Sequence, residues 1–295
     1  MSDGMSALTD VLAWVVVAGF ISSAFFQRQE GQRDVGRLLA SGSWVTFGVF
    51  WALLVPHFAF VQMSPIEGVL SAIAVPASLY VAYLIWSGRR DFATLTRAIA
   101  IMGIIYLPFE MSAVLQRTAI EMVTTHTEML MTTVGYDPTV IQGPDGHRST
   151  FEFVGDGHIF VTTVVLACTG IGSSATVSGL VLALDAPIRR RLLGVAIAVP
   201  VIYGLNVIRV GFIALAHGHQ WFADFQRPVF FLFGTDNPYM VSYLIADRVL
   251  AQSLSVVALV GLTLALLRLL PELATIVEDV LFLVTGKSYD IRSLL

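Results

Sequence analysis

Runs of about 20 apolar residues recur along the chain and restrict its fold more than any other feature. A helix needs about 20 mostly apolar residues to cross a hydrocarbon core roughly 30 Å thick. Inside a membrane only helices and closed barrels satisfy their backbone groups, and these unbroken runs lack the alternation of barrel strands. The pattern predicts seven spanning helices, at about 7–26, 38–61, 68–87, 98–116, 158–184, 192–216 and 246–270.

The composition agrees with this pattern. The chain is 56% hydrophobic and 13% charged, whereas soluble domains carry roughly 25% charged residues. We therefore expect an all-α integral membrane protein, a bundle of about seven helices forming one polytopic domain over residues 1–295. Residues 271–286 mix acidic and apolar residues, which is typical of a helix lying in the membrane interface, although an eighth crossing stays open.

Composition also excludes several kinds of function. A single cysteine allows no intramolecular disulfide and no Cys-rich metal site. The net charge of −4 argues against nucleic acid as a partner. Phosphate-loop, nucleophile-elbow and zinc-protease motifs are absent from the sequence, so we expect no cofactor and no metal.

Basic residues predict the orientation in the membrane. Twelve of the 17 basic residues lie in the loops after the first, third, fifth and seventh runs. By the positive-inside rule, the N-terminus lies outside and the C-terminus in the cytoplasm. The first run has no basic segment before it, so we interpret it as a retained span rather than a cleaved signal.

Two long loops are then expected on the outer side. Residues 117–157 begin with a helical stretch over Ala119–Val134, pass through turns, and continue into a short strand around Phe151 and Phe153. Residues 217–245 are rich in aromatic side chains, which favour the headgroup level of a membrane. This second loop is a candidate lid or substrate-binding surface.

Three polar groups stand out within the apolar runs, because ionisable residues in a membrane span usually mark function. With a rise of 1.5 Å per residue, Cys168 lies about 24 Å above Leu184 and Arg209 about 26 Å above Leu192. Arg248 lies about 33 Å above Leu270 by the same measure. The topology therefore places one thiol and two guanidiniums near the outer boundary of the membrane.

This combination has a coherent chemistry. A thiolate is the nucleophilic form of cysteine, and a nearby cation lowers the pKa of a thiol. Arginine keeps its charge when partly desolvated, and a second cation can stabilise an oxyanion. Gly170 and Gly172 would let a substrate backbone approach. We expect an active site near the outer face.

Other interpretations of the same residues stay open. Cys168 also fits a packing role among small residues, and Arg248 can extend to the interface. Arg209 lies between apolar residues and must find a partner. Asn206 shares its helix face, where it either orients the arginine or bonds another helix. Asp247 is a candidate counter-ion, although neighbouring residues on a helix point apart.

The proton acceptor is not determined by the sequence. His217 and His219 follow the sixth span, and His158 opens the fifth. His126 lies in the first long loop and is expected to be solvated. We keep Thr169, Asn206, His217 and His219 as supporting site residues.

The ordered motifs Ala167-Cys168-Thr169-Gly170-Ile171-Gly172-Ser173, Asn206-Val207-Ile208-Arg209-Val210 and Asp247-Arg248 resemble those of the exosortase/archaeosortase family. The resemblance implies a sortase-like cysteine transpeptidase with Cys168 as nucleophile, Arg209 as stabiliser of the thiolate or oxyanion, and Arg248 as charge stabiliser or proton donor. It implies membrane-anchored protein substrates with a C-terminal signal: a short motif (Pro-Gly-Phe in the archaeal case), a transmembrane segment and a basic tail. It further implies transfer of the new C-terminus to a membrane lipid.

Two other functions remain as alternatives. One is a transporter or assembly factor with a structural cysteine and with Arg209 paired to a buried acid. The other is an intramembrane protease that releases a soluble product.

Overall fold

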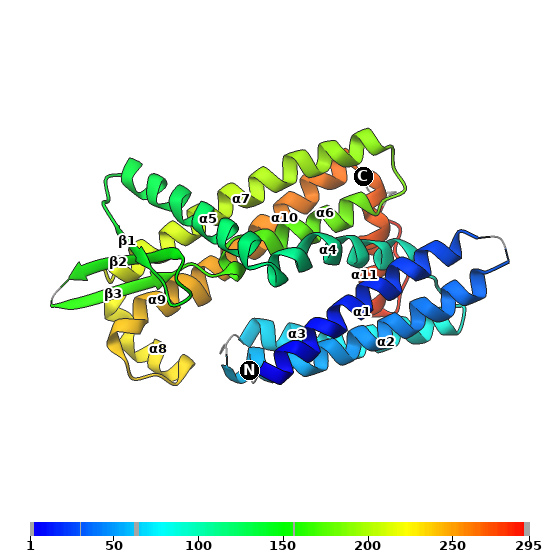
Figure 1. Ribbon diagram of the computed structural model, residues 1–295, viewed down its shortest axis with the longest axis horizontal. Helices are drawn as coiled ribbons and strands as arrows, with labels where there is room; N and C mark the ends of the chain where they lie inside the picture. The colour runs from blue at the N-terminus through cyan, green and yellow to red at the C-terminus, as the bar shows by residue number, and fades with distance from the viewer. Residues whose placement is uncertain (1–2, 30, 62–64, 156, 292–295) are drawn as a thin grey trace. The chain divides into compact units, whose positions relative to one another are not determined.

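The computed structural model describes residues 3–29, 31–61, 65–155 and 157–291, and helices dominate it (Figure 1). The α-helices are α1 Asp3–Gln27, α2 Arg33–Pro56, α3 Pro65–Trp86, α4 Ala93–Met111, α5 Ala113–Thr133, α6 Ile171–Leu182, α7 Ile188–Gly218, α8 Gln226–Phe233, α9 Val241–Leu244, α10 Gln252–Leu269 and α11 Ala274–Thr285. The strands are β1 Thr139–Gln142, β2 Arg148–Gly155 and β3 His158–Thr163. The π-helices are η1 His57–Val61 and η5 Ile245–Ala251, and the 3₁₀ turns are η2 Leu166–Cys168, η3 Ala223–Phe225, η4 Pro238–Met240 and η6 Pro271–Leu273.

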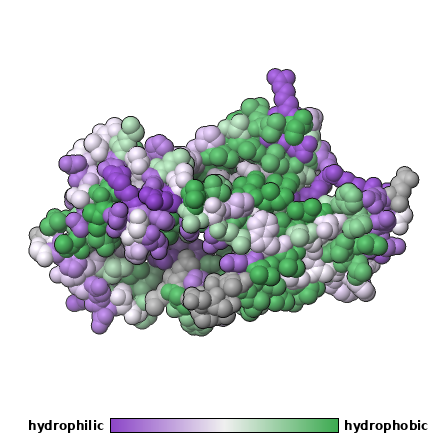
Figure 2. All heavy atoms as spheres, viewed as in Figure 1, coloured by the Kyte–Doolittle hydropathy of each residue, from purple (hydrophilic) through white to green (hydrophobic). Residues whose placement is uncertain are grey.

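Within the described residues, 6 helical stretches are long and apolar enough to cross a membrane. They are Leu8–Gln27, Arg33–Val61, Glu67–Trp86, Ala93–Met111, Ile188–Gly218 and Pro238–Leu269. Large apolar side chains such as Val69, Leu70 and Val257 remain exposed, and apolar residues cover much of the molecular surface in Figure 2. The prediction of a helical, multi-pass membrane protein is confirmed.

The prediction that the fifth span, 158–184, is a single helix is wrong. Its first part is strand β3, followed by turn η2, and only the 12 residues of α6 are α-helical. At 1.5 Å per residue α6 is about 18 Å long. Residues 161–165 are mostly β-branched, which favours a strand, and hydropathy alone does not distinguish an apolar strand from a helix.

Contacts group the chain into two compact units, each assembled from separate stretches of sequence. Unit 1 comprises residues 1–107, 175–196 and 266–295, and unit 2 comprises 108–174 and 197–265. In unit 1, α1, α2 and α3 lie side by side (Figure 1). Phe20 and Trp44 pack edge to face at 5.3 Å within their core. The Trp44 indole donates a hydrogen bond to Thr96 on α4 (3.0 Å), which ties α4 to this group.

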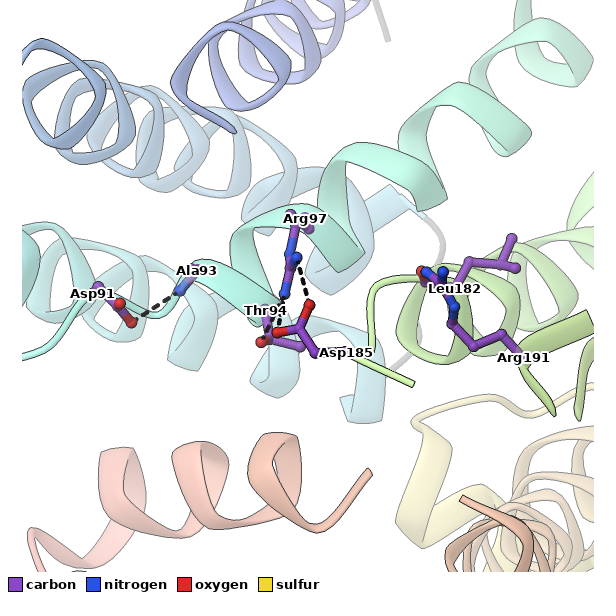
Figure 3. Close-up of polar contacts among 7 residues, drawn as sticks. All are labelled: Asp91, Ala93, Thr94, Arg97, Leu182, Asp185 and Arg191. Carbon is purple, nitrogen blue, oxygen red and sulfur yellow. Dashed lines mark hydrogen bonds and ion pairs between the residues drawn. The ribbon is translucent and has the colours of Figure 1, made fainter. Parts of the chain in front are cut away.

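Arginines at the helix ends of unit 1 form a set of polar contacts. Figure 3 shows Arg97 of α4 directed at Asp185, on the turn between α6 and α7. Both Arg97 Nη atoms donate to the Asp185 carboxylate, at 2.9 and 2.8 Å, and these bonds hold the pKa of Asp185 below its ordinary value. Arg191 donates to the carbonyl of Leu182 (2.7 Å), and Arg190 forms an ion pair with Glu272 (2.9 Å). These contacts join the loops that the sequence predicts to be cytoplasmic.

The C-terminal helix α11 favours the interfacial interpretation. Its 12 residues carry Glu278 and Asp279 among apolar side chains, a pattern typical of a helix in the membrane interface. Arg90, after α3, pairs with Asp279 (3.0 Å) and lies 3.9 Å from the centre of the Phe282 ring. These contacts hold α11 against the loop between α3 and α4.

Unit 2 contains a three-stranded antiparallel sheet in the order β1-β2-β3. Phe151 and Phe160 of the sheet are buried together with Val123 of α5 and Val210 and Ala214 of α7. The helical stretch and the short strand that the sequence predicts within residues 117–157 are thus confirmed as α5 and β2. Strand β3 leads through Val164 and Val165 directly to Cys168, so the sheet positions the cysteine.

Candidate active site

Cys168 is the last residue of the η2 turn, between β3 and α6. Its backbone N–H donates to the carbonyl of Val165 (2.8 Å). The buried Thr169 hydroxyl donates to the carbonyl of Leu166 (2.6 Å) and accepts from the N–H of Ile171 (3.4 Å), the first residue of α6. Thr169 therefore closes the turn and satisfies a free N–H group at the helix start. Its contacts fix the backbone that carries the thiol.

Gly170 has a φ of +76°, in the left-handed region that glycine adopts without strain. A Cβ atom at this position would lie 3.1 Å from the Cβ of Asn206. We expected Gly170 to make room for a substrate, but the space beside it is taken by Asn206. The glycine is needed for the turn and for the close approach of α7.

Asn206 connects the cysteine turn to α7. Its side-chain amide donates a short hydrogen bond to the backbone carbonyl of Cys168, and the residue is 8% exposed. The sequence allows Asn206 either to orient Arg209 or to bond another segment, and the structure shows the bond to another segment. Because Arg209 follows one helical turn later on the same face, Asn206 also sets where the cysteine lies relative to that arginine.

Asp247 joins the two arginines. Arg209 Nη2 lies 2.9 Å from Asp247 Oδ1, and Arg248 Nε lies 3.4 Å from Asp247 Oδ2. The side chains are 27%, 11% and 16% exposed for Arg209, Asp247 and Arg248. Tyr243 lies close enough to the same carboxylate to interact with it electrostatically. The partner that Arg209 requires is therefore Asp247.

The π-helix η5 explains how the neighbours Asp247 and Arg248 contact each other. A π-helix closes i→i+5 hydrogen bonds, so successive side chains are rotated less than in an α-helix. Both residues lie within η5, Ile245–Ala251. We expected sequence neighbours to point apart, as they do on an α-helix, and the wider turn changes this.

The thiol of Cys168 lies within the electrostatic reach of this cluster. Among the charges that act on the sulfur, those of Arg209 and Arg248 attract a negative charge there and that of Asp247 repels it. The cluster carries two positive charges and one negative charge, hence a net charge of +1. This balance favours one anion, such as a thiolate or an oxyanion, at the site.

Four histidines of unit 2 contact aromatic rings and hydroxyl groups. His217 is buried, its Nδ1 is 3.1 Å from the Thr162 hydroxyl, and its ring packs against Phe160 and Tyr243. His219 packs against Tyr136 and Phe153. His158, on β3, stacks on Tyr239 at 4.1 Å. His126 is exposed on α5, where its Nδ1 lies 2.6 Å from the Tyr203 hydroxyl. Their observed contacts are with aromatic and hydroxyl groups.

No group of three or more His, Cys, Asp or Glu side chains suited to a metal ion occurs in the part of the chain that the structure describes. The chemistry available at Cys168 is that of a thiol beside a hydrogen-bonded cationic cluster. Such a site can form a covalent acyl intermediate and can stabilise the negative charge that develops on a carbonyl oxygen.

Comparison with known proteins agrees with this arrangement. The model of the transmembrane exosortase family matches residues 9–240, a range that includes Cys168 and Arg209. The chain belongs to the exosortase/archaeosortase family. It is 45% identical to Archaeosortase A of Haloferax volcanii, over 97% of both chains. It is 44% identical to Archaeosortase A of Natronomonas pharaonis, over 94% of this chain and 89% of the relative. No solved structure matches it.

Family membership confirms the enzyme class expected from the sequence. This exosortase-family protein is a membrane processing enzyme of the cysteine transpeptidase type. The alternative of a transporter or assembly factor loses its support, although the pairing of Arg209 with a buried acid that it required is observed.

Sequence reasoning missed part of the site. Asp247 was considered only as a counter-ion for Arg248, and Tyr243 only as one aromatic residue of an outer loop. The available signal was an aspartate inside an apolar span, which requires a partner as an arginine does.

Proposed function

We propose that this exosortase-family protein cleaves a C-terminal sorting signal from membrane-anchored proteins through a thioester on Cys168 and transfers the new C-terminus to a membrane lipid. The observation that carries the proposal is the cysteine turn, which Asn206 holds to α7 one helical turn before Arg209, the partner of Asp247 in the cluster with Arg248. The curated relatives, named archaeosortases, support the same class of reaction.

In the first step, the Cys168 thiolate attacks the scissile carbonyl carbon and forms a C–S bond. The carbonyl oxygen becomes an oxyanion, which guanidinium groups stabilise. Arg209 Nε is buried and has no hydrogen-bond partner among the described residues, so it is a candidate donor to this oxyanion. Collapse of the intermediate breaks the C–N bond, and the released amine takes up the proton that the thiol lost.

In the second step, a hydroxyl or amine of a lipid headgroup attacks the thioester. The C–S bond breaks and the proton of the acceptor passes to the sulfur, so the Cys168 thiol is restored. A site at membrane level favours a lipid over bulk water by proximity. Transfer of the acyl group from the thioester to the lipid needs no added energy source, because the thioester is more reactive than the ester or amide that replaces it.

The proposed topology places the thiol near the outer face. Cys168 precedes α6, and Arg189, Arg190 and Arg191 follow it, so the cysteine and this basic cluster flank α6 on opposite sides in the sequence. By the positive-inside rule the arginines are cytoplasmic, which places the N-terminus outside and the C-terminus inside. The non-helical backbone of η2 is acceptable at membrane depth because Val164, Leu166 and Thr169 are buried in protein.

The experiment uses a reporter protein that ends in a Pro-Gly-Phe motif, a transmembrane segment and a basic tail. We expect the wild-type protein to remove the C-terminal segment, and both Cys168→Ala and Cys168→Ser to lose processing by at least about a thousandfold. Asp185→Asn, which breaks an ion pair in unit 1, is the control and should process normally.

Mass spectrometry of the reporter's new C-terminus tests the transfer step. A lipid adduct supports the proposal, whereas a free carboxylate as the initial product means hydrolysis in place of transfer. A reporter still processed by both cysteine variants would exclude Cys168 as the nucleophile.

A further inference from the structure

The contacts of the candidate site converge on one carboxylate, that of Asp247. Arg209 reaches it from α7 at 2.9 Å, and Arg248 reaches it from within η5 at 3.4 Å. Tyr243, on α9, lies within the electrostatic reach of the same carboxylate. The Asp247 side chain is 11% exposed, so these partners replace most of its solvent. No other described acidic residue pairs with Arg209 in the observed ion pairs.

Two guanidiniums near one thiol repel each other, so something must hold both in place. A carboxylate offers two oxygens and accepts several hydrogen bonds, and here each oxygen faces one arginine. It cancels one of the two positive charges, so the pair is stable and a net charge of +1 remains. That charge is enough to balance one thiolate or one oxyanion.

The carboxylate also determines which guanidinium atoms stay free. Arg209 bonds Asp247 through Nη2, while its Nε is buried without a partner among the described residues. A buried N–H group without a partner is costly, and such groups in a site are donors prepared for a ligand. If Asp247 held Arg209 through Nε instead, this donor would be consumed.

We propose that Asp247 is a positioning residue of this active site. Its carboxylate orients the guanidiniums of Arg209 and Arg248 toward the reacting carbonyl, and the Tyr243 hydroxyl orients the carboxylate. Asp247 acts through the arginines and does not contact the substrate. This inference rests on the proposed function, because it assigns Asp247 a part in the same reaction.

The test compares four variants of the full-length protein in lipid nanodiscs with the reporter described above. Asp247→Asn keeps the shape and removes the charge. Asp247→Glu keeps the charge and lengthens the side chain. Tyr243→Phe removes only the hydroxyl, and Asp185→Asn removes the carboxylate of an exposed Asp–Arg ion pair in unit 1.

We expect Asp247→Asn to lower kcat at least 100-fold and to leave KM within about threefold, since the substrate does not contact this residue. Asp247→Glu should recover at least a tenth of the wild-type kcat. Tyr243→Phe should lose about tenfold in kcat, and Asp185→Asn should match the wild type.

Two further readouts separate positioning from a structural role. The first is the thermal unfolding temperature of each variant. The second is the alkylation rate of Cys168 by N-ethylmaleimide, which does not depend on processing. We expect Asp247→Asn to alkylate at least as fast as the wild type, because a negative charge near the thiol has been removed.

A wild-type kcat for Asp247→Asn would overturn the inference. The inference is also overturned if Asp247→Asn and Asp247→Glu lose kcat equally and in proportion to a loss of folded protein. If Asp247→Asn does not fold, an unchanged kcat in Tyr243→Phe overturns it. Failure of the proposed function has a different signature, because Cys168→Ala would then still process the reporter.

Discussion

At the scale of single residues, the polar and small side chains around Cys168 act mainly on the backbone. Thr169 closes the turn, Asn206 holds the Cys168 carbonyl, and Gly170 adopts a left-handed conformation where α7 comes closest. Each of these contacts limits where the sulfur lies. The location of a nucleophile is thus determined by groups that need not touch the substrate, and a misplacement of about 1 Å is enough to slow a reaction.

The Gly170→Ala substitution tests this dependence. The left-handed conformation costs an L-residue about 1–2 kcal/mol, and the added methyl would displace Asn206, 3.1 Å away. We expect a lower unfolding temperature and a processing rate reduced at least tenfold. Thermal unfolding in detergent and the reporter assay measure the two effects.

The matched control is Gly204→Ala on α7, where a Cβ meets nothing within 4 Å. Replacing a glycine inside a helix by alanine is neutral or stabilising by about 0.5–1 kcal/mol. Equal behaviour of the two variants would contradict the role given to Gly170.

At the scale of elements, short irregular segments position three residues of the candidate site, Cys168, Asp247 and Arg248. Turn η2 places the cysteine at the start of α6, and η5 brings Asp247 and Arg248 to the same side. In unit 1, ion pairs connect the ends of several helices. The pair between Arg97 of α4 and Asp185 before α7 is one example in unit 1.

Loss of this pair should depend on pH. Hydrogen bonds from Arg97 hold the pKa of Asp185 below its ordinary value of 3.8. A carboxylate with a lowered folded-state pKa contributes stability above its unfolded pKa, and this contribution is lost as the pH falls through the folded pKa. The contribution is at most about 1 kcal/mol, because the Asp185 side chain is 78% exposed.

We therefore expect Asp185→Asn to unfold a few degrees below the wild type near neutral pH, with the difference shrinking at acid pH below about 4. Asp34→Asn is the control. Asp34 also forms an ion pair with an arginine, Arg37, and its side chain is 91% exposed. A difference between Asp185→Asn and the wild type that grows on acidification would refute this account.

At the scale of the whole molecule, the distribution of basic residues determines the orientation that we propose. Six of the basic residues are arginines at the ends of α1–α4, and three more begin α7. Positive charge is retained on the cytoplasmic side of a membrane. An enzyme acting on surface proteins needs its thiol on the other side. Orientation and function are therefore linked, and one experiment tests both.

Single introduced cysteines measure the orientation. In a Cys168→Ser background the chain has no other cysteine, so Asp236→Cys and Arg189→Cys each report one loop, and both positions are exposed. A membrane-impermeant maleimide should label intact cells carrying Asp236→Cys. It should label Arg189→Cys only after permeabilisation, and the reverse result would invert the topology.

The sequence by itself determined that the protein is a helical membrane protein and where most spans lie, and it supplied the candidate residues for the proposed chemistry. These properties are local: an apolar run of 20 residues and a charge inside it are visible without any neighbour in space. Cys168, Arg209 and Arg248 were found because a thiol and two guanidiniums are unusual in such runs.

The tertiary structure alone decided how these residues meet. Residues 158–163 form a strand rather than a helix because β2, the strand just before them, supplies hydrogen-bond partners across a hairpin. Asp247 becomes the common partner of two arginines because η5 widens the helix and α7 packs beside it. Gly170 faces Asn206 for the same kind of reason. Each outcome depends on pairing or packing between separate segments, which the hydropathy pattern of one segment does not contain.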